Sequence, residues 1–118
     1  MKALSIRQPW VYLIMQGGKD IENRTWRTNH RGTILVHAAK GMTRKEYNAV
    51  NEWSCLPPYE LLERGGIVGT VEIVDCVAQS DSSWFSGPFG FVLRNPQPLP
   101  FRPYLGELGF FNVTEEIV

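Results

Sequence analysis

The sequence predicts an α+β fold with mainly β content, in which about six short strands form a bent β-barrel that carries two or three short helices. Short apolar segments with strand-like patterns recur along the whole 118-residue chain. Helical patterns are few and lie before residue 67, and so small a chain favours one strongly bent sheet. With 43% hydrophobic and 20% charged residues, the composition suits a single domain over residues 1–118.

The first elements are a strand and a short helix. Residues 2–7 alternate, with apolar side chains on one side, as expected of a strand. Pro9 suits the first turn of a helix because its missing N–H has no intrahelical partner there. A helix over residues 9–16 follows, with an apolar stripe at helical spacing, and the glycine pair at 17 and 18 supplies a left-handed stop.

A capping box marks the start of the second helix. The Thr43 hydroxyl and the Glu46 carboxylate are placed to satisfy each other's free N–H groups, and Met42 with Tyr47 forms a hydrophobic staple around them. We therefore expect a helix over residues 44–53.

The remaining elements are mostly strands. Two are expected over residues 21–27 and 33–39, on either side of a turn at residues 31 and 32. The second half is predicted to begin with a helical turn over 59–66 and to contain three strands, over 67–78, 88–95 and 108–113. A loop over 80–87 joins the first two of these strands. A proline-rich segment over 96–103 is expected to cross the surface in extended form before the last strand. The strand over 67–78 is apolar on both faces, which predicts a central position in the sheet.

Charge is distributed unevenly along the chain although the net charge is zero. Residues 1–45 carry nine basic and two acidic groups, whereas residues 46–118 carry three basic and ten acidic groups. One interpretation is a basic face, built from the N-terminal third, that steers a polyanion toward one site. The alternative is that folding interleaves the two parts and cancels the field.

Several classes of protein are not indicated. Cys55 and Cys76 have no cysteine or histidine at metal-ligand spacing, so we expect free thiols and no metal site. No phosphate-binding glycine motif, HExxH, CxxC or GxSxG occurs, and no cofactor is expected. No apolar run approaches the ~18 residues that cross a bilayer, and the N-terminus lacks the features of a signal peptide. We therefore expect a cytoplasmic protein without a membrane partner.

The stretch GGKDIENRTWR, residues 17–27, carries the strongest indication of a site. On a strand, Glu22, Arg24 and Trp26 project from one face at intervals of about 7 Å. A carboxylate accepts N–H groups of a base, a guanidinium binds a phosphate or carbonyl, and an indole offers a stacking surface. Lys19, in the turn before the strand, is placed to reach a cleft on the same face as Glu22, Arg24 and Trp26. The structural alternative is a Glu22–Arg24 pair that closes one end of the barrel beside a solvated Lys19.

Other candidates lie outside this stretch. Gln8 and Trp10 are placed at the mouth of the cleft, although Trp10 also suits an anchor of the first helix. His37 lies in the apolar strand over 33–39, with Lys40 just beyond its end, and is a ligand or acid–base candidate or a hydrogen-bonded core residue. Trp84 lies in a serine-rich loop and is a candidate lid that stacks on a base, or simple hydrophobic cover.

The motif GxKxxExR, which begins at Gly17, resembles the signature of the ASCH domain family of the PUA-like β-barrel superfamily. The segments ALSIRQPW, VHAAK and LGFFNV resemble the same family, so the resemblance covers nearly the whole chain. It implies a PUA-like barrel and a cleft near the signature that serves RNA or nucleotide-related ligands.

Three functions remain open. The first is a module that binds RNA or a modified nucleoside. The second is a small metal-independent hydrolase with Lys19 and Glu22 as catalytic residues. Some ASCH proteins resemble amidohydrolases that act on N4-acylated cytidine, with a threonine at the position held here by Glu22, and others resemble ribonucleases. The third is a protein-interaction adaptor that uses the proline-rich segment 96–103.

Overall fold

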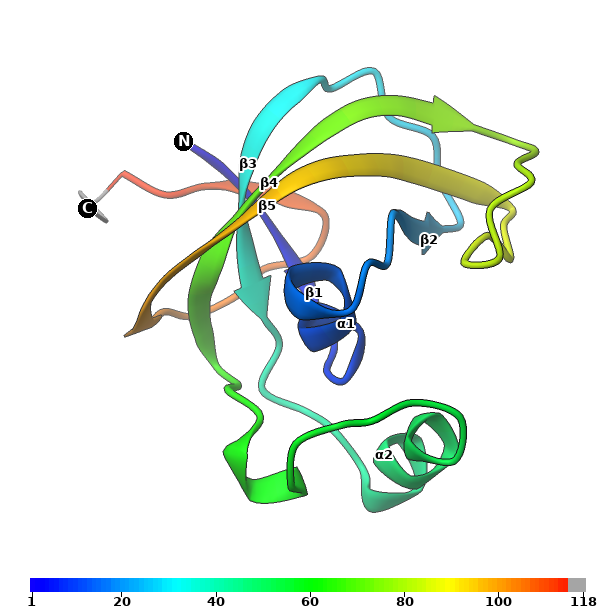
Figure 1. Cartoon of the computed structure of the whole chain (residues 1–118). Coiled ribbons are helices and arrows are strands. Elements are labelled where there is room, and N and C mark those ends of the chain that lie inside the picture. Colours follow the sequence, from blue (N-terminus) through cyan, green and yellow to red (C-terminus); the bar gives the residue numbers. More distant parts are fainter. Residues whose placement is uncertain (115–118) are drawn as a thin grey trace.

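The computed structural model describes residues 1–114 and shows a curled sheet with two α-helices, the α+β and mainly β fold that the sequence predicts (Figure 1). In chain order the elements are β1 (Lys2–Ile6), α1 (Trp10–Gln16), β2 (Ile21–Arg24), β3 (Gly32–Ala38), α2 (Arg44–Asn51), the 3₁₀ turn η1 (Tyr59–Leu61), β4 (Gly66–Val77), β5 (Phe89–Pro103) and β6 (Phe110–Asn112). Neither α-helix is long and apolar enough to cross a membrane, within the part of the chain that the structure describes.

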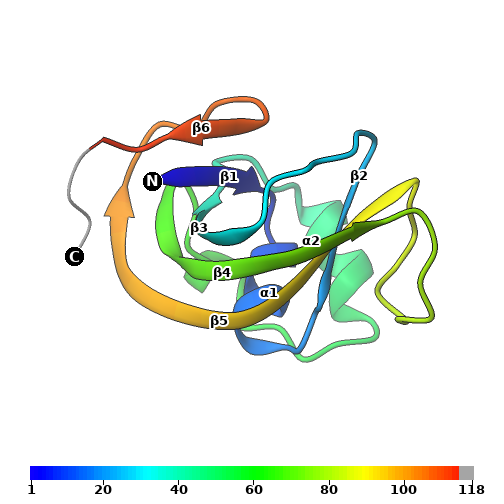
Figure 2. The same cartoon turned by 90° about the horizontal axis from the view of Figure 1, so that it is seen from above.

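The six strands form one sheet in the order β2-β5-β4-β3-β1-β6. β1 and β3 run parallel, and the other neighbours run antiparallel. β4 is central, as its two apolar faces predict. The sheet curls into a half-barrel whose edges are β2 and β6, and Figure 2 shows α1 inside the curve of β5. Apolar side chains from both fill this space, among them Val11 and Ile14 of α1 and Phe91 of β5.

Side chains bridge the open seam between the edges of the sheet. Arg24 at the end of β2 donates from Nη2 to the carbonyl oxygen of Ser5 in β1 at 2.8 Å. Trp26 lies edge-on to Phe110 of β6, with ring centroids 5.6 Å apart. The first strand and the β2 edge are therefore joined through side chains, and the seam keeps a groove on its surface.

The predicted capping box is present at the start of α2. The Thr43 hydroxyl accepts from the backbone N–H of Glu46 at 3.1 Å, and the Glu46 carboxylate accepts from the N–H of Thr43 at 2.7 Å. Met42 and Tyr47 are both buried in one cluster with Leu62, as the staple predicts. The helix ends at Asn51, two residues before the predicted end.

Several strands differ from their predicted lengths, most of all β2, β5 and β6, and β6 covers only Phe110–Asn112 of the predicted 108–113. β2 ends at Arg24 and not at residue 27, because its partner β5 begins at Phe89, which faces Arg24. β5 is much longer than predicted, since residues 96–103 continue it and pair with β4. Beyond Val92 no described strand pairs with the other side of β5, so its prolines lie at a sheet edge where a missing N–H is tolerated. The proline-rich segment is thus extended and mostly exposed, as predicted, but it is paired with β4 as part of the sheet.

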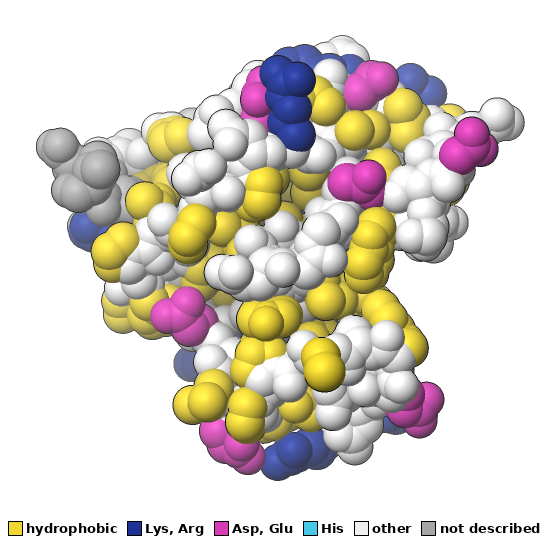
Figure 3. Space-filling model, viewed as in Figure 1, with side chains coloured by type: hydrophobic (Ala, Val, Ile, Leu, Met, Phe, Trp, Pro, Cys, Tyr) yellow, Lys and Arg dark blue, Asp and Glu magenta, His cyan; other side chains and the backbone are white. Residues whose placement is uncertain are grey.

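Folding interleaves much of the charge. Arg7, Arg31 and Arg44 from the basic third of the chain form ion pairs with Glu46, Asp75 and Glu60 from the acidic remainder. Figure 3 shows basic and acidic side chains close together on the face it presents. For these three residues, the second interpretation of the charge pattern holds.

Candidate functional site

The signature residues converge at the seam because of two local features. Gly18, at φ +76°, reverses the chain after α1, so that the N–H of Lys19 donates to the carbonyl oxygen of Leu13 at 3.0 Å and the side chain turns inward. β2 then pairs with β5, with Glu22 opposite Phe91, and carries Glu22 and Arg24 into the seam.

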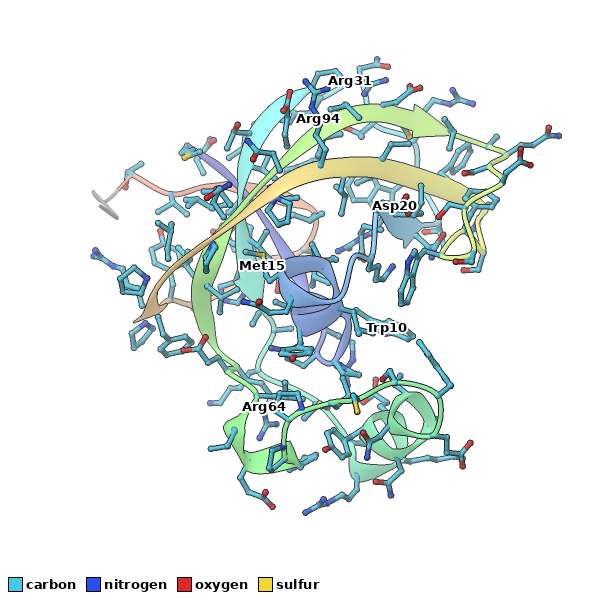
Figure 4. The ribbon with its side chains drawn as sticks, in the orientation of Figure 1. Trp10, Met15, Asp20, Arg31, Arg64 and Arg94 are labelled. Carbon is cyan, nitrogen blue, oxygen red and sulfur yellow. The ribbon has the colours of Figure 1, made fainter. Side chains whose placement is uncertain are left out.

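Three tryptophans from distant parts of the chain enclose a cavity of about 380 Å³, here called the tryptophan pocket. Its lining residues are Trp10, Lys19, Glu22, Asn23, Trp53, Ser83, Trp84, Phe85 and Ser86. Figure 4 shows Trp10 projecting from the start of α1, on the side of α2. The Trp53 ring, just after α2, lies 6.4 Å from Trp10 and 5.8 Å from Trp84 between centroids. The pocket therefore joins α1, the end of α2 and the loop before β5.

Lys19 lies in this pocket with only 5% of its surface exposed. Its ammonium donates to the carbonyl oxygen of Ile21 and lies 5.5 Å from the ring centroid of Trp10 and 5.7 Å from that of Trp84. Burial lowers the pKa of Lys19, and the charges of Glu22 and Asp20 oppose that shift. Lys19 is therefore buried and is not the solvated side chain that the structural alternative requires.

Glu22 is also buried, at 8% exposure, and Arg24 holds its carboxylate. Nε of Arg24 donates to its Oε2 at 3.1 Å, while Nη2 of the same guanidinium is anchored on Ser5. Burial raises the pKa of the Glu22 carboxyl, and the charges of Arg24 and Lys19 act in the opposite direction. The pocket thus contains a buried cation and a buried anion side by side.

Asn23 positions the loop that carries Trp84. Its Nδ2 donates to the carbonyl oxygen of Trp84 at 3.0 Å, and its Oδ1 accepts from the N–H groups of Ser86 and Gly87 at 2.9 and 3.1 Å. The Ser82 hydroxyl adds a bond to Asp20 at 2.6 Å. Trp84 is therefore a fixed wall of the pocket.

A second cavity of about 360 Å³ continues along the seam and is called here the seam groove. Glu22 and Trp10 line both cavities, whereas Arg24 and Trp26 line only the groove. The Trp26 ring lies edge-on to Phe91, with centroids 5.2 Å apart, and packs against the core. Trp26 borders the site mainly as a core residue.

The other predicted site residues lie elsewhere. Gln8 is buried and links the segment after η1 to α1, since it donates to the carbonyl oxygen of Glu63 at 2.8 Å and accepts from the N–H of Tyr12 at 3.0 Å. His37 and Lys40 line a separate cavity of about 650 Å³. The structure thus brings together Trp10, Lys19, Glu22, Arg24, Trp26 and Trp84, and leaves Gln8, His37 and Lys40 outside this cleft.

Asn23 and Trp53 line the site and were not predicted as site residues from the sequence. Strand alternation places Asn23 on the face opposite Glu22 and Arg24, and only its side-chain contacts reveal its role in the loop. Trp53 falls at the predicted end of the second helix, and its 57% exposure is unusual for an indole. A large aromatic residue at an otherwise polar helix end is the signal that points to it.

Comparison with known proteins gives a consistent assignment. The sequence profile of the ASCH domain matches residues 4–99. Activating signal cointegrator 1 of Homo sapiens is 30% identical to the chain in an alignment that covers 97% of this chain and 22% of that protein. The Mus musculus protein of the same name is 31% identical over the same shares. The chain therefore spans about a fifth of the length of these relatives, since the covered share is 22%.

Proposed function

The chain belongs to the ASCH domain family, and from this premise we propose that the cleft at its seam binds RNA or a modified nucleoside. A single unstacked base enters the tryptophan pocket, and the attached sugar and phosphate lie toward the seam groove. The observation that supports this most strongly is the pair of buried charged side chains, Lys19 and Glu22, beneath three indoles. Unstacked bases are recognised by aromatic stacking together with hydrogen bonds to their edges.

Charge balance favours a defined pocket over bulk attraction. The formal net charge of the protein is zero, and several of its arginines are already paired with acids. A protein of this kind gains little from counterion release along a phosphate backbone. Affinity must then come from stacking and from the polar groups of the pocket.

The roles of the residues follow from their contacts. Trp84, held by Asn23, and Trp53 offer ring faces to a base. Glu22 accepts from the edge of the base and Lys19 donates to it. Arg24 holds Glu22 in place and lines the groove beside the ligand.

The test is a calorimetric titration with single-stranded RNA pentamers and with nucleosides, plain and modified. Trp84→Ala should weaken binding by about 1 to 3 kcal/mol, the range for loss of one stacking side chain. Phe101→Ala, which alters a partly exposed ring on β5 away from the cleft, is the matched control and should leave affinity unchanged. Absence of binding to all these ligands by a folded protein would refute the proposal.

Hydrolysis of the same class of ligand is the second candidate function. The lowered pKa of Lys19 beside the raised pKa of Glu22 suits a base and its proton partner. The ASCH proteins that resemble amidohydrolases have a threonine at the position that Glu22 holds here. Any such reaction in this protein therefore has no hydroxyl nucleophile at that position. Product formation from N4-acylcytidine, followed by chromatography, tests it. If turnover exists, Lys19→Ala should reduce it by more than it reduces affinity.

A further inference from the structure

We propose that the tryptophan pocket selects bases with a lactam edge, in which an N–H stands beside a C=O, over bases with an amino edge. Uracil and hypoxanthine have the favoured edge, and cytosine and adenine have the disfavoured one. The inference rests on the proposed function and adds the class of base that the pocket accepts.

Glu22 has one carboxylate oxygen left for a ligand. Arg24 donates to Oε2, whereas no hydrogen bond from residues 1–114 reaches Oε1. Among these described residues, no fully buried side-chain oxygen or nitrogen lacks a partner. Oε1 is therefore accessible from the cavities that Glu22 lines, and the arginine that holds Oε2 lies on the groove side. An ionised carboxylate oxygen only accepts, so this position requires a donor on the ligand.

Lys19 supplies the complementary group. Its ammonium has three N–H groups, of which one is used by the carbonyl oxygen of Ile21. The remaining N–H groups lie in the pocket with the indoles of Trp10 and Trp84 on its walls, where they require an acceptor. A carbonyl oxygen carries more negative charge than a ring nitrogen and projects beyond the ring, so it is the better partner for a buried cation.

An N–H beside a C=O satisfies both groups at once. In cytosine and adenine the acceptor is a ring nitrogen and the donor is an amine with two N–H groups. Glu22 has only one open oxygen, so the second N–H of the amine is left without an acceptor when the base closes the pocket. Guanine has the favoured carbonyl and ring N–H but also an amine, which places it between the two classes.

The experiment uses RNA pentamers in which one test base, U, I, G, C or A, is flanked by abasic positions, so that charge and length are constant. Fluorescence anisotropy with the full chain should show U and I binding about tenfold more tightly than C and A, with G intermediate, a ratio within the range for one paired edge. The comparison of I with G isolates the extra amine. The 3-methyluridine pentamer, which lacks the ring N–H, should bind as weakly as C.

Glu22→Gln replaces the open oxygen with a group that both donates and accepts, and should reduce the U to C ratio to within about threefold. If this variant does not fold, the pair uridine and 3-methyluridine on the wild type still decides the question. Equal binding of all five bases, or preference for C or A, would overturn the base selectivity and leave the proposed function intact. Failure of every pentamer to bind the folded protein would overturn both.

Discussion

Two Glu–Arg pairs consist of the same groups in different surroundings: one lies in the seam, and the other joins Arg7, just after β1, to Glu46 of α2. In the Glu22–Arg24 pair the side chains of Arg24 and Glu22 are 20% and 11% exposed. In the Arg7–Glu46 pair the side chains of Arg7 and Glu46 are 48% and 36% exposed. Burial raises the pKa of Glu22, whereas the bond from Arg7 and that from the Thr43 N–H lower the pKa of Glu46 to about 2.

The opposite shifts assign different roles to the two pairs. The lowered pKa of Glu46 means that the folded state favours its ionised form, so the pair and the capping box hold α2 against the rest of the protein. The raised pKa of Glu22 means that folding disfavours its ionised form even with Arg24 beside it. A charge maintained against that cost, in a cavity, is expected where a ligand is recognised.

The largest effect is expected when the buried pair is broken from the arginine side. Arg24→Met leaves Glu22 buried without its partner and should lower the free energy of unfolding at pH 7 by about 2 to 3 kcal/mol, below the full range for buried pairs because both groups are partly solvated. Arg7→Met at the exposed pair is the matched control and should cost less than about 1 kcal/mol. Urea denaturation measures both.

A double variant sharpens this comparison. Glu22→Gln combined with Arg24→Met should recover most of the lost stability, because no unpaired charge is then buried. Equal losses from Arg24→Met and Arg7→Met would contradict the distinction between the two pairs.

The next effect concerns binding and not stability. Glu22→Gln should weaken RNA binding by about 1 to 3 kcal/mol while leaving the free energy of unfolding at pH 7 unchanged or higher, because the new amide oxygen can still accept from Arg24 and the charge that folding disfavours is gone. The sign follows from linkage, since a raised folded pKa contributes stability below the ordinary carboxyl range that is lost as pH rises through the folded value. Calorimetric titration and urea denaturation of the same variant are the two measurements. A variant that loses stability but keeps affinity would show that Glu22 is structural.

A smaller effect is expected at the helix cap. Thr43→Ala removes the hydroxyl that accepts from the N–H of Glu46 and should cost about 1 kcal/mol of unfolding free energy. Thr43→Ser keeps the hydroxyl and serves as the control. In urea denaturation, the free energy of unfolding of Thr43→Ser should be close to that of the wild type. Equal losses in Thr43→Ser and Thr43→Ala would mean that the methyl group, and not the hydroxyl, stabilises the helix start.

The sequence predicts well what depends on neighbouring residues. The start of α2 at Arg44 follows from Thr43 and Glu46 alone, and the central place of β4 follows from its two apolar faces. The end of β2 at Arg24 depends on where β5 begins, which no local pattern reveals. The continuation of β5 through four prolines was missed because an edge position, where proline is tolerated, is a property of the sheet.

The site residues also fall into those that neighbouring residues predict and those that only long-range packing brings in. The convergence of Lys19, Glu22 and Arg24 follows from a turn and a strand that are adjacent in sequence. Trp53 completes the pocket only because α2 folds back toward α1, which is a long-range result. His37 lies in another cavity because its side chain bonds the Ser5 hydroxyl and the backbone of the segment after β5.

The smallest expected effect is the pH dependence of the exposed pair. Because the pKa of Glu46 is about 2 in the folded protein and 4.5 is its ordinary value, its contribution to stability is present above pH 4.5 and is lost as pH falls toward 2. The group is more than a third exposed, so the change should stay below about 1 kcal/mol. Amide hydrogen exchange should show faster opening of α2 than of β4 over this range. In Glu46→Gln, α2 should open faster at neutral pH and show little further change with acid. Exchange that accelerates equally in α2 and β4 would mean that acid acts on the whole fold and that the pair does not hold α2 locally.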